Sequence, residues 1–277
     1  MDRSKIKKLL IGEFTIRRLI RSIVLIYAAI TIFVYFYADR IIFLPQPSSY
    51  EDGPTFLKIK TETDTQISAL YLPDPKAEFI IIYSHGNAED IGNIRLLLER
   101  FNLNGFSVLA YDYQGYGTSG GRPSETKAYQ DIEAVYQYVI NQLNIPPNRI
   151  IAMGRSIGSA VATHLASQHQ IAGLILVSPL TSAFRVITHI PLLPFDKFNN
   201  LRNIRKINCP VLIIHGTDDK IIPFLHGQKL FEKANEPKFN LWVENAGHND
   251  DISQIAGTFY WEKIRQLTNS ITEKQKE

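Results

Sequence analysis

Short apolar runs alternate with longer amphipathic segments along most of this chain. Most of the runs are continuously apolar, which is typical of strands that are buried on both faces of a sheet. The strands predicted from these runs are Phe79–Tyr83, Phe106–Tyr111, Ile150–Met153, Ile171–Val177, Val211–Ile214 and Phe239–Val243. Two earlier segments, Phe56–Lys60 and Gln66–Leu72, alternate between apolar and polar residues and predict antiparallel strands.

Amphipathic segments with helical spacing lie between these strands. They are found at Ile91–Asn102, Glu125–Asn144, Ser159–Ala166, Phe224–Lys233 and Gln254–Thr268, and the last seven residues are expected to fray. Strands that alternate with helices predict an α/β fold with a mostly parallel central sheet and helices on both of its faces. The 277 residues, 45% of them hydrophobic, suffice for one large catalytic domain, which we place at residues 55–270.

An uncharged segment of 17 residues, Ser22–Ala38, lies near the N-terminus. Together with Leu19 and Ile20 it reaches the length of a short membrane-spanning helix, which we predict at residues 19–38. A cleaved signal peptide and a buried core helix are the alternatives. However, no small-residue cleavage site follows the segment, and a core helix needs no cluster of cations before it. We therefore expect an uncleaved signal anchor, followed by a turn-rich linker at residues 39–54.

The positive charges are concentrated before this apolar segment. Residues 1–21 form a basic N-terminal segment with a net charge of +5, so that the total of +3 leaves −2 for the rest of the chain. This bias predicts a cytoplasmic N-terminus and a catalytic domain on the extracytoplasmic side of the membrane. A hairpin-like insertion would instead hold the domain at the cytoplasmic face. The body of the chain lacks the positive excess of nucleic-acid-binding proteins, so we expect no nucleic-acid partner.

The pentapeptide Gly154-Arg155-Ser156-Ile157-Gly158 joins a predicted strand to a predicted helix. A G-x-S-x-G sequence in this context is typical of a sharp turn that exposes a nucleophilic serine. The glycines leave room for neighbouring elements, and the start of the helix supplies unpaired backbone N–H groups beside the hydroxyl. The pattern also occurs by chance. The assignment of Ser156 as a nucleophile therefore depends on finding a base and an acid elsewhere in the chain.

Polar residues directly follow two later strands, where an open parallel sheet gathers its reacting groups. Asp218 and Asp219 follow the strand at 211–214, and His248 follows the strand at 239–243. We favour Asp219 over Asp218 because its spacing from Gly216 places it at the tip of the loop. The order serine, acid, histidine is that of the α/β hydrolases. The sequence therefore predicts Ser156, Asp219 and His248 as the catalytic residues.

The negative oxygen that forms in acyl transfer needs backbone N–H donors near the serine. Ile157 follows the nucleophile and supplies one donor. The loop His85-Gly86-Asn87, which follows the strand at 79–83, supplies a second donor through Asn87. We expect Asn87 and Ile157 to form the oxyanion hole, and chemistry of this type requires no cofactor and no metal.

Two other features of the sequence suggest chemistry but favour structural roles. Residues 115–120 spell G-x-G-x-x-G, the fingerprint of a dinucleotide site, but Pro123 intervenes before a helix can begin. We therefore expect a structural loop there. The single cysteine, Cys209, excludes an intrachain disulfide and a cysteine-based metal cluster, and its place at the start of an apolar strand predicts that it packs.

Residues 55–268 resemble the α/β-hydrolase superfamily, most of all its branch of membrane-associated protein depalmitoylases and related hydrolases. The matching stretches are SHGNAED (84–90), YDYQGYGTSGGRPSE (111–125), GRSIGSA (154–160), SPLTSAFRV (178–186), PVLIIHGTDDKIIPFLHG (210–227) and LWVENAGHND (241–250). The resemblance implies a serine hydrolase with Ser156, Asp219 and His248 as its triad. Those depalmitoylases attach to membranes through a cysteine-rich, lipid-modified segment, whereas this chain has no cysteine before Cys209.

Residues 179–209 form a short cap insert between two strands, where many related hydrolases carry a lid. Its apolar residues either pack over the sheet or form a rim for an acyl chain, and we expect substrate contacts from Phe184, Ile187 and Leu192. Three functions stay open: hydrolysis of an ester or thioester of a lipid-like or protein-bound acyl group, an aminopeptidase-like serine peptidase, and a non-catalytic, membrane-anchored binding protein. The complete set of triad residues disfavours the third. Asp196, as the only acid of the insert, disfavours the second. The sequence predicts no oligomeric state.

Overall fold

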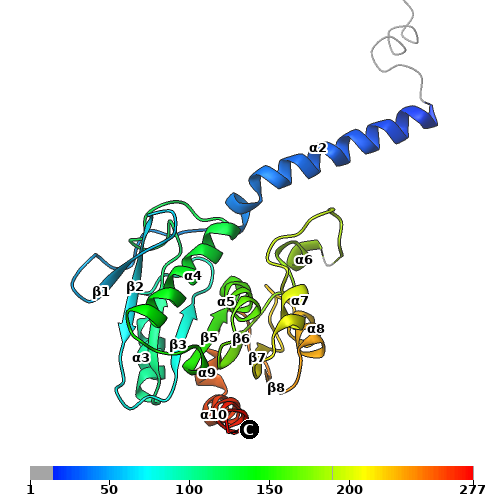
Figure 1. Ribbon diagram of the computed structural model, residues 1–277. Coiled ribbons are helices and arrows are strands. Elements are labelled where there is room, and N and C mark those ends of the chain that lie inside the picture. Colours follow the sequence, from blue (N-terminus) through cyan, green and yellow to red (C-terminus); the bar gives the residue numbers. More distant parts are fainter. Residues whose placement is uncertain (1–14, 189, 277) are drawn as a thin grey trace, which may run out of the picture. The chain divides into compact units, whose positions relative to one another are not determined.

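A computed structural model describes residues 15–188 and 190–276 of the chain, which divide into two compact units. The unit that ends at Ile41 contains one long helix, α2 (Ile16–Ile42). The unit that begins at Ile42 contains the sheet and the other described helices (Figure 1).

The second unit is built on an eight-stranded sheet with the strand order β1-β2-β4-β3-β5-β6-β7-β8. The pairs β1–β2 and β2–β4 are antiparallel, and the remaining pairs are all parallel. The strands are β1 (Phe56–Lys60), β2 (Gln66–Leu72), β3 (Ile80–Ser84), β4 (Ser107–Tyr111), β5 (Ile150–Arg155), β6 (Gly173–Val177), β7 (Val211–Gly216) and β8 (Lys238–Val243). The predicted α/β fold with a mostly parallel sheet is therefore confirmed.

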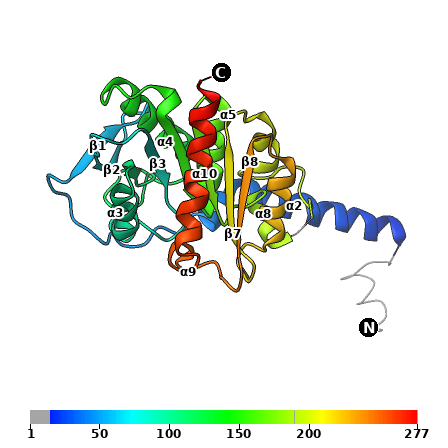
Figure 2. The same ribbon diagram turned by 90° about the horizontal axis from the view of Figure 1, so that it is seen from below.

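Helices cover both faces of this sheet. On one face lie α3 (Arg95–Leu103) and α10 (Thr258–Lys274), as Figure 2 shows. On the other face lie α4 (Glu125–Asn141), α5 (Ile157–Gln168) and α8 (Leu225–Lys233). Shorter elements complete the described part of the unit: α6 (Ala183–Thr188), α7 (Asn200–Asn203), α9 (Ile252–Ile255) and the 3₁₀ turns Pro147–Arg149 and Ile204–Lys206.

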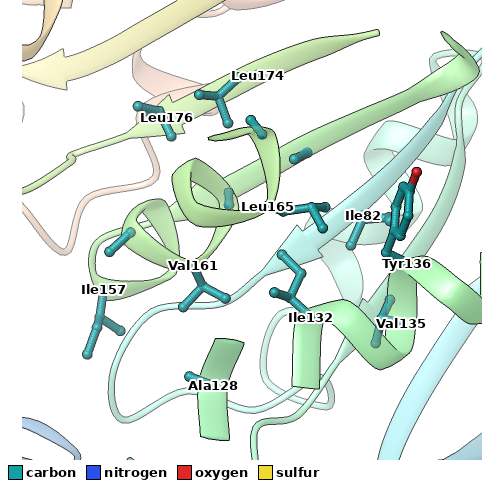
Figure 3. Close-up of a cluster of buried hydrophobic side chains, with 14 of the residues drawn as sticks. Ile82, Ala128, Ile132, Val135, Tyr136, Ile157, Val161, Leu165, Leu174 and Leu176 are labelled. Carbon is teal, nitrogen blue, oxygen red and sulfur yellow. The ribbon is translucent and has the colours of Figure 1, made fainter. Parts of the chain in front are cut away.

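Successive residues of the central strands point into two different hydrophobic clusters. In β3, Ile80 and Ile82 belong to the cluster under α4 and α5, whereas Ile81 and Tyr83 belong to the cluster under α3 and α10. Figure 3 shows the first cluster, where side chains of α4 and α5 meet those of β3 and β6. All four β3 residues are at most 1% exposed, and a buried side chain of this size contributes about 1.5–3 kcal/mol. Burial on both faces explains why these strands are continuously apolar.

The C-terminal helix differs from the expected one. The segment expected as one helix from 254 to 268 is divided into α9 and α10, because Gly257 between them has a φ of 55° that a continuous helix does not allow. In addition, α10 continues to Lys274, so the expected fraying from Ile271 is wrong. Ile271 is only 2% exposed and packs with Leu267 against the sheet, which extends the helix into the polar tail.

The helix that was expected from Ile91 begins later, at Arg95. The backbone N–H of Ile91 donates to Oδ1 of Asp112 instead of entering a helical turn (2.9 Å). A buried contact with a neighbouring loop therefore outweighs the helical periodicity of these residues.

Helix α2 is long and apolar enough to cross a membrane, and most of its large apolar side chains are exposed. Arg17, Arg18 and Arg21 lie in its first turns, whereas residues 1–14 of the basic N-terminal segment lie outside the described residues. A signal sequence would share these properties, so the anchor at residues 19–38 stays a prediction.

The segment expected as a linker, residues 39–54, enters the second unit at Ile42. Phe43 is 3% exposed, and its ring centroid lies 5.8 Å from that of Phe198. Farther along, the backbone N–H of Ser49 donates to Oδ2 of Asp90 (2.7 Å). Residues 42–50 of the expected linker thus make specific contacts with the folded body.

Candidate active site

Ser156 lies at a sharp turn between β5 and α5, at the carboxyl edge of the parallel strands. Its backbone has φ 53° and ψ −122°, a conformation that residues with a side chain rarely adopt. The N–H of Ser156 donates to the carbonyl oxygen of Val177 at the end of β6 (2.9 Å), which ties the turn to the sheet. Strain of this kind, held by the surrounding structure, is typical of a turn that presents a nucleophile.

The two glycines of the motif allow α5 to begin in direct contact with the end of β3. A Cβ atom on Gly158 would lie 2.1 Å from the carbonyl oxygen of Ser84 and 2.5 Å from that of His85. A Cβ atom on Gly154 would lie 2.1 Å from the carbonyl oxygen of Gly158. Backbone therefore packs on backbone, and this contact brings the loop after β3 against the first turn of α5.

His248 links Ser156 to Asp219. Nε2 of His248 lies 3.0 Å from Oγ of Ser156, and Nδ1 of His248 lies 2.7 Å from Oδ2 of Asp219. The three residues come from the loops after β5, β7 and β8, and each is at most 9% exposed. The structure thus brings together the three residues that the sequence predicted, in the geometry that a nucleophile, a base and an orienting acid require.

The carboxylate of Asp219 is held in its ionised form by several donors. Its Oδ1 accepts the backbone N–H groups of Ile221 (3.0 Å) and Ile222 (2.7 Å). Burial alone would raise the pKa of Asp219, but the hydrogen bonds from His215 and His248 hold this pKa well below its usual value. Asp218, the alternative acid, is exposed, so the structure favours Asp219 as the partner of the histidine.

His215 is a residue of this site to which the sequence analysis gave no role. Its ring is fully buried, with Nε2 2.9 Å from the carbonyl oxygen of Ile222 and 3.3 Å from Oδ2 of Asp219. A proton on Nε2 would serve both acceptors, so two histidines hold the same carboxylate. The position of His215 at the end of β7, just before the acid loop, is the sequence signal that could have identified it.

The side chain of Asn87 forms hydrogen bonds with Tyr116 and with two residues that precede β1. Its Oδ1 accepts the hydroxyl of Tyr116 (2.6 Å) and the N–H of Leu44 (2.9 Å). Its Nδ2 donates to the carbonyl oxygen of Ile42 (2.5 Å). Any contribution of Asn87 to an oxyanion hole therefore comes from its backbone N–H. Ile157 is the first residue of α5, where backbone N–H groups have no partner within the helix.

The G-x-G-x-x-G stretch forms a closed loop that carries Tyr116. The N–H of Gly115 donates to the carbonyl oxygen of Gly120 (2.9 Å), and α4 begins only at Glu125. A dinucleotide fingerprint would open directly into a helix. The loop instead contributes the hydroxyl that fixes Asn87.

The residues that were expected to contact substrate lie in the insert, but they do not all lie together. Phe184 and Leu192 line a cavity of about 280 Å³, whereas Ile187 is 77% exposed and is not part of its lining. Asp196 lines the same cavity. Its carboxylate accepts the hydroxyl of Ser182 (2.6 Å) and the N–H of Phe184 (3.0 Å), so this acid stabilises the insert itself.

Cys209 is not suited to nucleophilic chemistry. It is partly buried against the cluster under α4 and α5, and burial raises the pKa of its thiol to about 12. A thiol with this pKa is fully protonated at neutral pH, and the protonated form is a poor nucleophile. Its packing role agrees with the expectation from the sequence.

One family model and several known proteins match parts of this chain. The family model described as "Serine aminopeptidase, S33" matches residues 75–194. Alpha/beta hydrolase domain-containing protein 17B from Homo sapiens is 41% identical over 233 residues, covering 80% of this chain and 77% of the relative. Alpha/beta hydrolase domain-containing protein 17C from Mus musculus is 39% identical over 219 residues, covering 75% of this chain and 65% of the relative.

Solved structures share the fold at lower identity. The esterase Pf2001 from Pyrococcus furiosus matches with a TM-score of 0.68 and 20% identity, covering 82% of this chain and 97% of the esterase. Est1E from Butyrivibrio proteoclasticus, solved with ferulic acid, matches with a TM-score of 0.63 and 20% identity, covering 76% of this chain and 99% of Est1E. These similarities show the α/β-hydrolase fold.

We expect Asp219→Asn to remove part of the acid dependence of stability. Because the pKa of Asp219 is lower in the folded chain, its charge stabilises the fold above the pKa of the unfolded state, about 3.9. This contribution is lost as the pH falls below that value towards the folded pKa. Denaturant unfolding of the full-length protein in detergent, at several values from about pH 6 to about pH 3, should therefore show a smaller loss of stability in the variant than in the wild type.

Asp218→Asn is the matched control, since its carboxyl is exposed one residue away. It should retain the wild-type dependence of unfolding free energy on pH. Identical acid dependence in the wild type and in both variants would contradict the assigned role of the Asp219 charge.

Proposed function

This chain belongs to the family of the alpha/beta hydrolase domain-containing protein 17 proteins, and on that premise we propose that it is a membrane-anchored serine hydrolase that cleaves a carboxylic ester or thioester. The observation that carries the proposal is the pair of contacts from His248 to Ser156 and to Asp219. They place a base within reach of a hydroxyl at a strained turn, which is the arrangement that acyl transfer needs.

In the proposed reaction, Nε2 of His248 takes the proton of Ser156 as Oγ attacks the acyl carbonyl carbon. Asp219 keeps Nδ1 of His248 protonated and stabilises the imidazolium that forms. His248 then gives the proton to the departing alcohol or thiol, which leaves an acyl group on Ser156. Water, with its proton taken by His248, attacks this acyl-enzyme, and the carboxylic acid departs as the serine is restored.

We assign the stabilisation of the oxyanion to the backbone N–H groups of Asn87 and Ile157. The assignment is supported by the contact of Gly158 with the carbonyl groups of Ser84 and His85, which holds the two loops together. It is also supported by the fixed side chain of Asn87, since a donor that is held in place needs no reorganisation during the reaction. One such donor contributes about 2.7–4 kcal/mol to the stabilisation of the transition state.

The insert favours an acyl group over a peptide with a free amino terminus. An aminopeptidase needs an acid to bind the substrate ammonium group, and Asp196 is the only acid of the insert. Its oxygens already accept hydrogen bonds from Ser182 and Phe184. The apolar residues Phe184, Ile187 and Leu192 would instead contact the acyl chain of a lipid-like substrate or of an acylated protein. The matching family model, described as a serine aminopeptidase, is the reason to retain the peptidase as the second candidate.

We also propose that α2 anchors the protein as a single span at residues 19–38, with the N-terminus in the cytoplasm and the catalytic domain on the extracytoplasmic side. The exposed apolar side chains of α2 support the span. Arg17, Arg18 and Arg21 before the uncharged stretch support the orientation. The catalytic domain at 55–270 would then follow the linker at residues 39–54, parts of which contact the folded body.

We expect Ser156→Ala to abolish hydrolysis and labelling by a fluorophosphonate, because both reactions require the activated hydroxyl. Activity on short p-nitrophenyl esters should fall at least about a thousandfold. Ser167→Ala, on the far end of the same helix, is the control and should retain wild-type labelling. Labelling of the Ser156→Ala variant at the wild-type rate would overturn the assignment.

The same preparations distinguish the two enzymatic candidates. A panel of p-nitrophenyl acyl esters and an S-acyl thioester is compared with aminoacyl anilides. Turnover of esters and thioesters without turnover of anilides is the expected result, whereas selective turnover of anilides would support the peptidase.

We expect Leu192→Asn to weaken the binding of long acyl chains, because a polar side chain on the rim cannot bury methylene groups. The KM for p-nitrophenyl esters of about twelve carbons should rise roughly fivefold to tenfold, with little change for acetate, since each buried CH₂ contributes about 0.8 kcal/mol. Leu103→Asn is the control, because Leu103 ends α3 and is 85% exposed. Equal changes in KM for short and long esters would contradict a role of Leu192 in chain binding.

We expect the full-length protein to remain in membranes after an alkaline carbonate wash. The wash releases proteins that are held at the membrane surface by charge, whereas a spanning helix is held by its apolar side chains. A C-terminal tag should be cleaved when protease is added to intact cells. A tag that is cleaved only after permeabilisation would place the catalytic domain on the cytoplasmic side and contradict the proposed orientation.

A further inference from the structure

We propose that Arg155 and Glu89 form a positioning pair. The pair fixes the loop that contains His248 (the histidine loop) and the loop His85-Gly86-Asn87 (the oxyanion loop) relative to the turn at Ser156. The inference rests on the proposed function of Ser156 and assigns to the same site two residues that do not touch the reacting atoms. Arg155 is the last residue of β5 and directly precedes Ser156, and Glu89 lies in the loop that follows β3.

Three contacts carry the proposal. Nη2 of Arg155 donates to the backbone carbonyl oxygen of His248 (2.7 Å). Nη1 of Arg155 forms an ion pair with Oε1 of Glu89. The other oxygen of Glu89, Oε2, accepts the backbone N–H of Gly86 (2.8 Å). One continuous chain of contacts therefore runs from His248 through Arg155 and Glu89 to the residue that precedes Asn87.

Arg155 and Glu89 are largely buried and pack directly against Gly86. The side chains of Arg155 and Glu89 are only 17% and 22% exposed, so solvent screens their interaction weakly. A Cβ atom on Gly86 would lie 2.8 Å from Oε2 of Glu89 and 3.4 Å from Nη1 of Arg155. The two charged groups thus rest directly on the backbone of the oxyanion loop.

The backbone of Arg155 is held in place because it is paired within the sheet. It is paired with Val177 in the parallel register of β5 and β6, whereas His248 lies in a loop beyond the end of β8. A planar guanidinium offers two donors at a fixed spacing, here used for Glu89 and for His248. A displacement of about 1 Å at a reacting group can reduce the rate about a hundredfold, so the position of this loop matters for the chemistry.

The test compares Arg155→Met, Arg155→Lys and Glu89→Gln in the full-length protein, with a short p-nitrophenyl ester as substrate. We expect Arg155→Met to lower kcat about 10-fold to 100-fold while KM changes less than about twofold. Fluorophosphonate labelling should slow by the same factor, because it depends on the same activated serine. Arg155→Lys should recover part of kcat, since it keeps the charge but not the two-pronged geometry.

Arg149→Met is the matched control, since Arg149 precedes the same strand at its opposite end. Its Nε and Nη2 donate to the carbonyl oxygens of Glu78 and Ala77, each at 2.6 Å. The variant loses an arginine that bridges two segments by the same chemistry, but far from the carboxyl edge of the sheet. We expect it to lower the melting temperature and to leave kcat unchanged.

A double variant, Arg155→Met with Glu89→Gln, tests whether the two residues act as a unit. Its kcat should be no lower than that of the slower single variant, because the second change removes a contact that is already lost. Independent, multiplicative losses would contradict the pair. A rise in KM without a change in kcat would also contradict the pair. If Arg155→Met fails to fold, wild-type kcat in the folded Arg155→Lys and Glu89→Gln variants would contradict it.

Failure of the two proposals can be told apart. If Ser156→Ala is inactive but Arg155→Met and Glu89→Gln keep wild-type kcat, only the positioning role is wrong. If Ser156→Ala remains active, the proposed function itself is wrong.

Discussion

The candidate site depends on the close approach of the first turn of α5 to the end of β3. Gly158 lies so close to the carbonyl groups of Ser84 and His85 that a Cβ atom would not fit between them. The contact holds the start of the helix beside the loop that contains Asn87. It also requires the sharp turn at Ser156, because α5 can reach β3 only if the chain reverses abruptly after β5. The φ of 53° at Ser156 is the local cost of this arrangement.

The strand order then determines what lies on each side of the serine. In the sheet, β5 is flanked by β3 on one side and by β6, β7 and β8 on the other. The loop after β3 therefore reaches Ser156 from one side, and the loops of Asp219 and His248 reach it from the other. Because the strands are parallel, all these loops leave the same edge of the sheet. The placement of the Asn87 loop on one side of Ser156, and of Asp219 and His248 on the other, is thus a consequence of topology.

The elements and the three central residues could be predicted from sequence for the same physical reason. A strand buried on both faces is apolar whatever its neighbours are, and Ser156 and Asp219 follow such strands, whereas His248 follows the edge strand β8, most of which is only partly buried. Contacts between a side chain and a distant backbone leave no such pattern. The turn-rich residues around Ser49 indicated a linker, but nothing in their composition shows that they bind to Asp90. The residues after Thr268 are mostly polar, so their composition did not indicate that Ile271 is buried and that α10 continues past it.

Arg155 and Glu89 illustrate why a charged pair can be retained where an apolar pair would pack as well. Removing two charges from water is unfavourable, and apolar residues of similar volume are often as stable in such places. However, an apolar pair would leave the N–H of Gly86 and the carbonyl oxygen of His248 without these partners, at a cost of about 1–3 kcal/mol for each buried group. Each charged side chain uses one atom for its partner and another for a backbone group of a loop. The capacity for two directed hydrogen bonds, more than the Coulomb attraction, therefore accounts for the charges at this position, and it joins the end of β5 to the loops that contain Gly86 and His248.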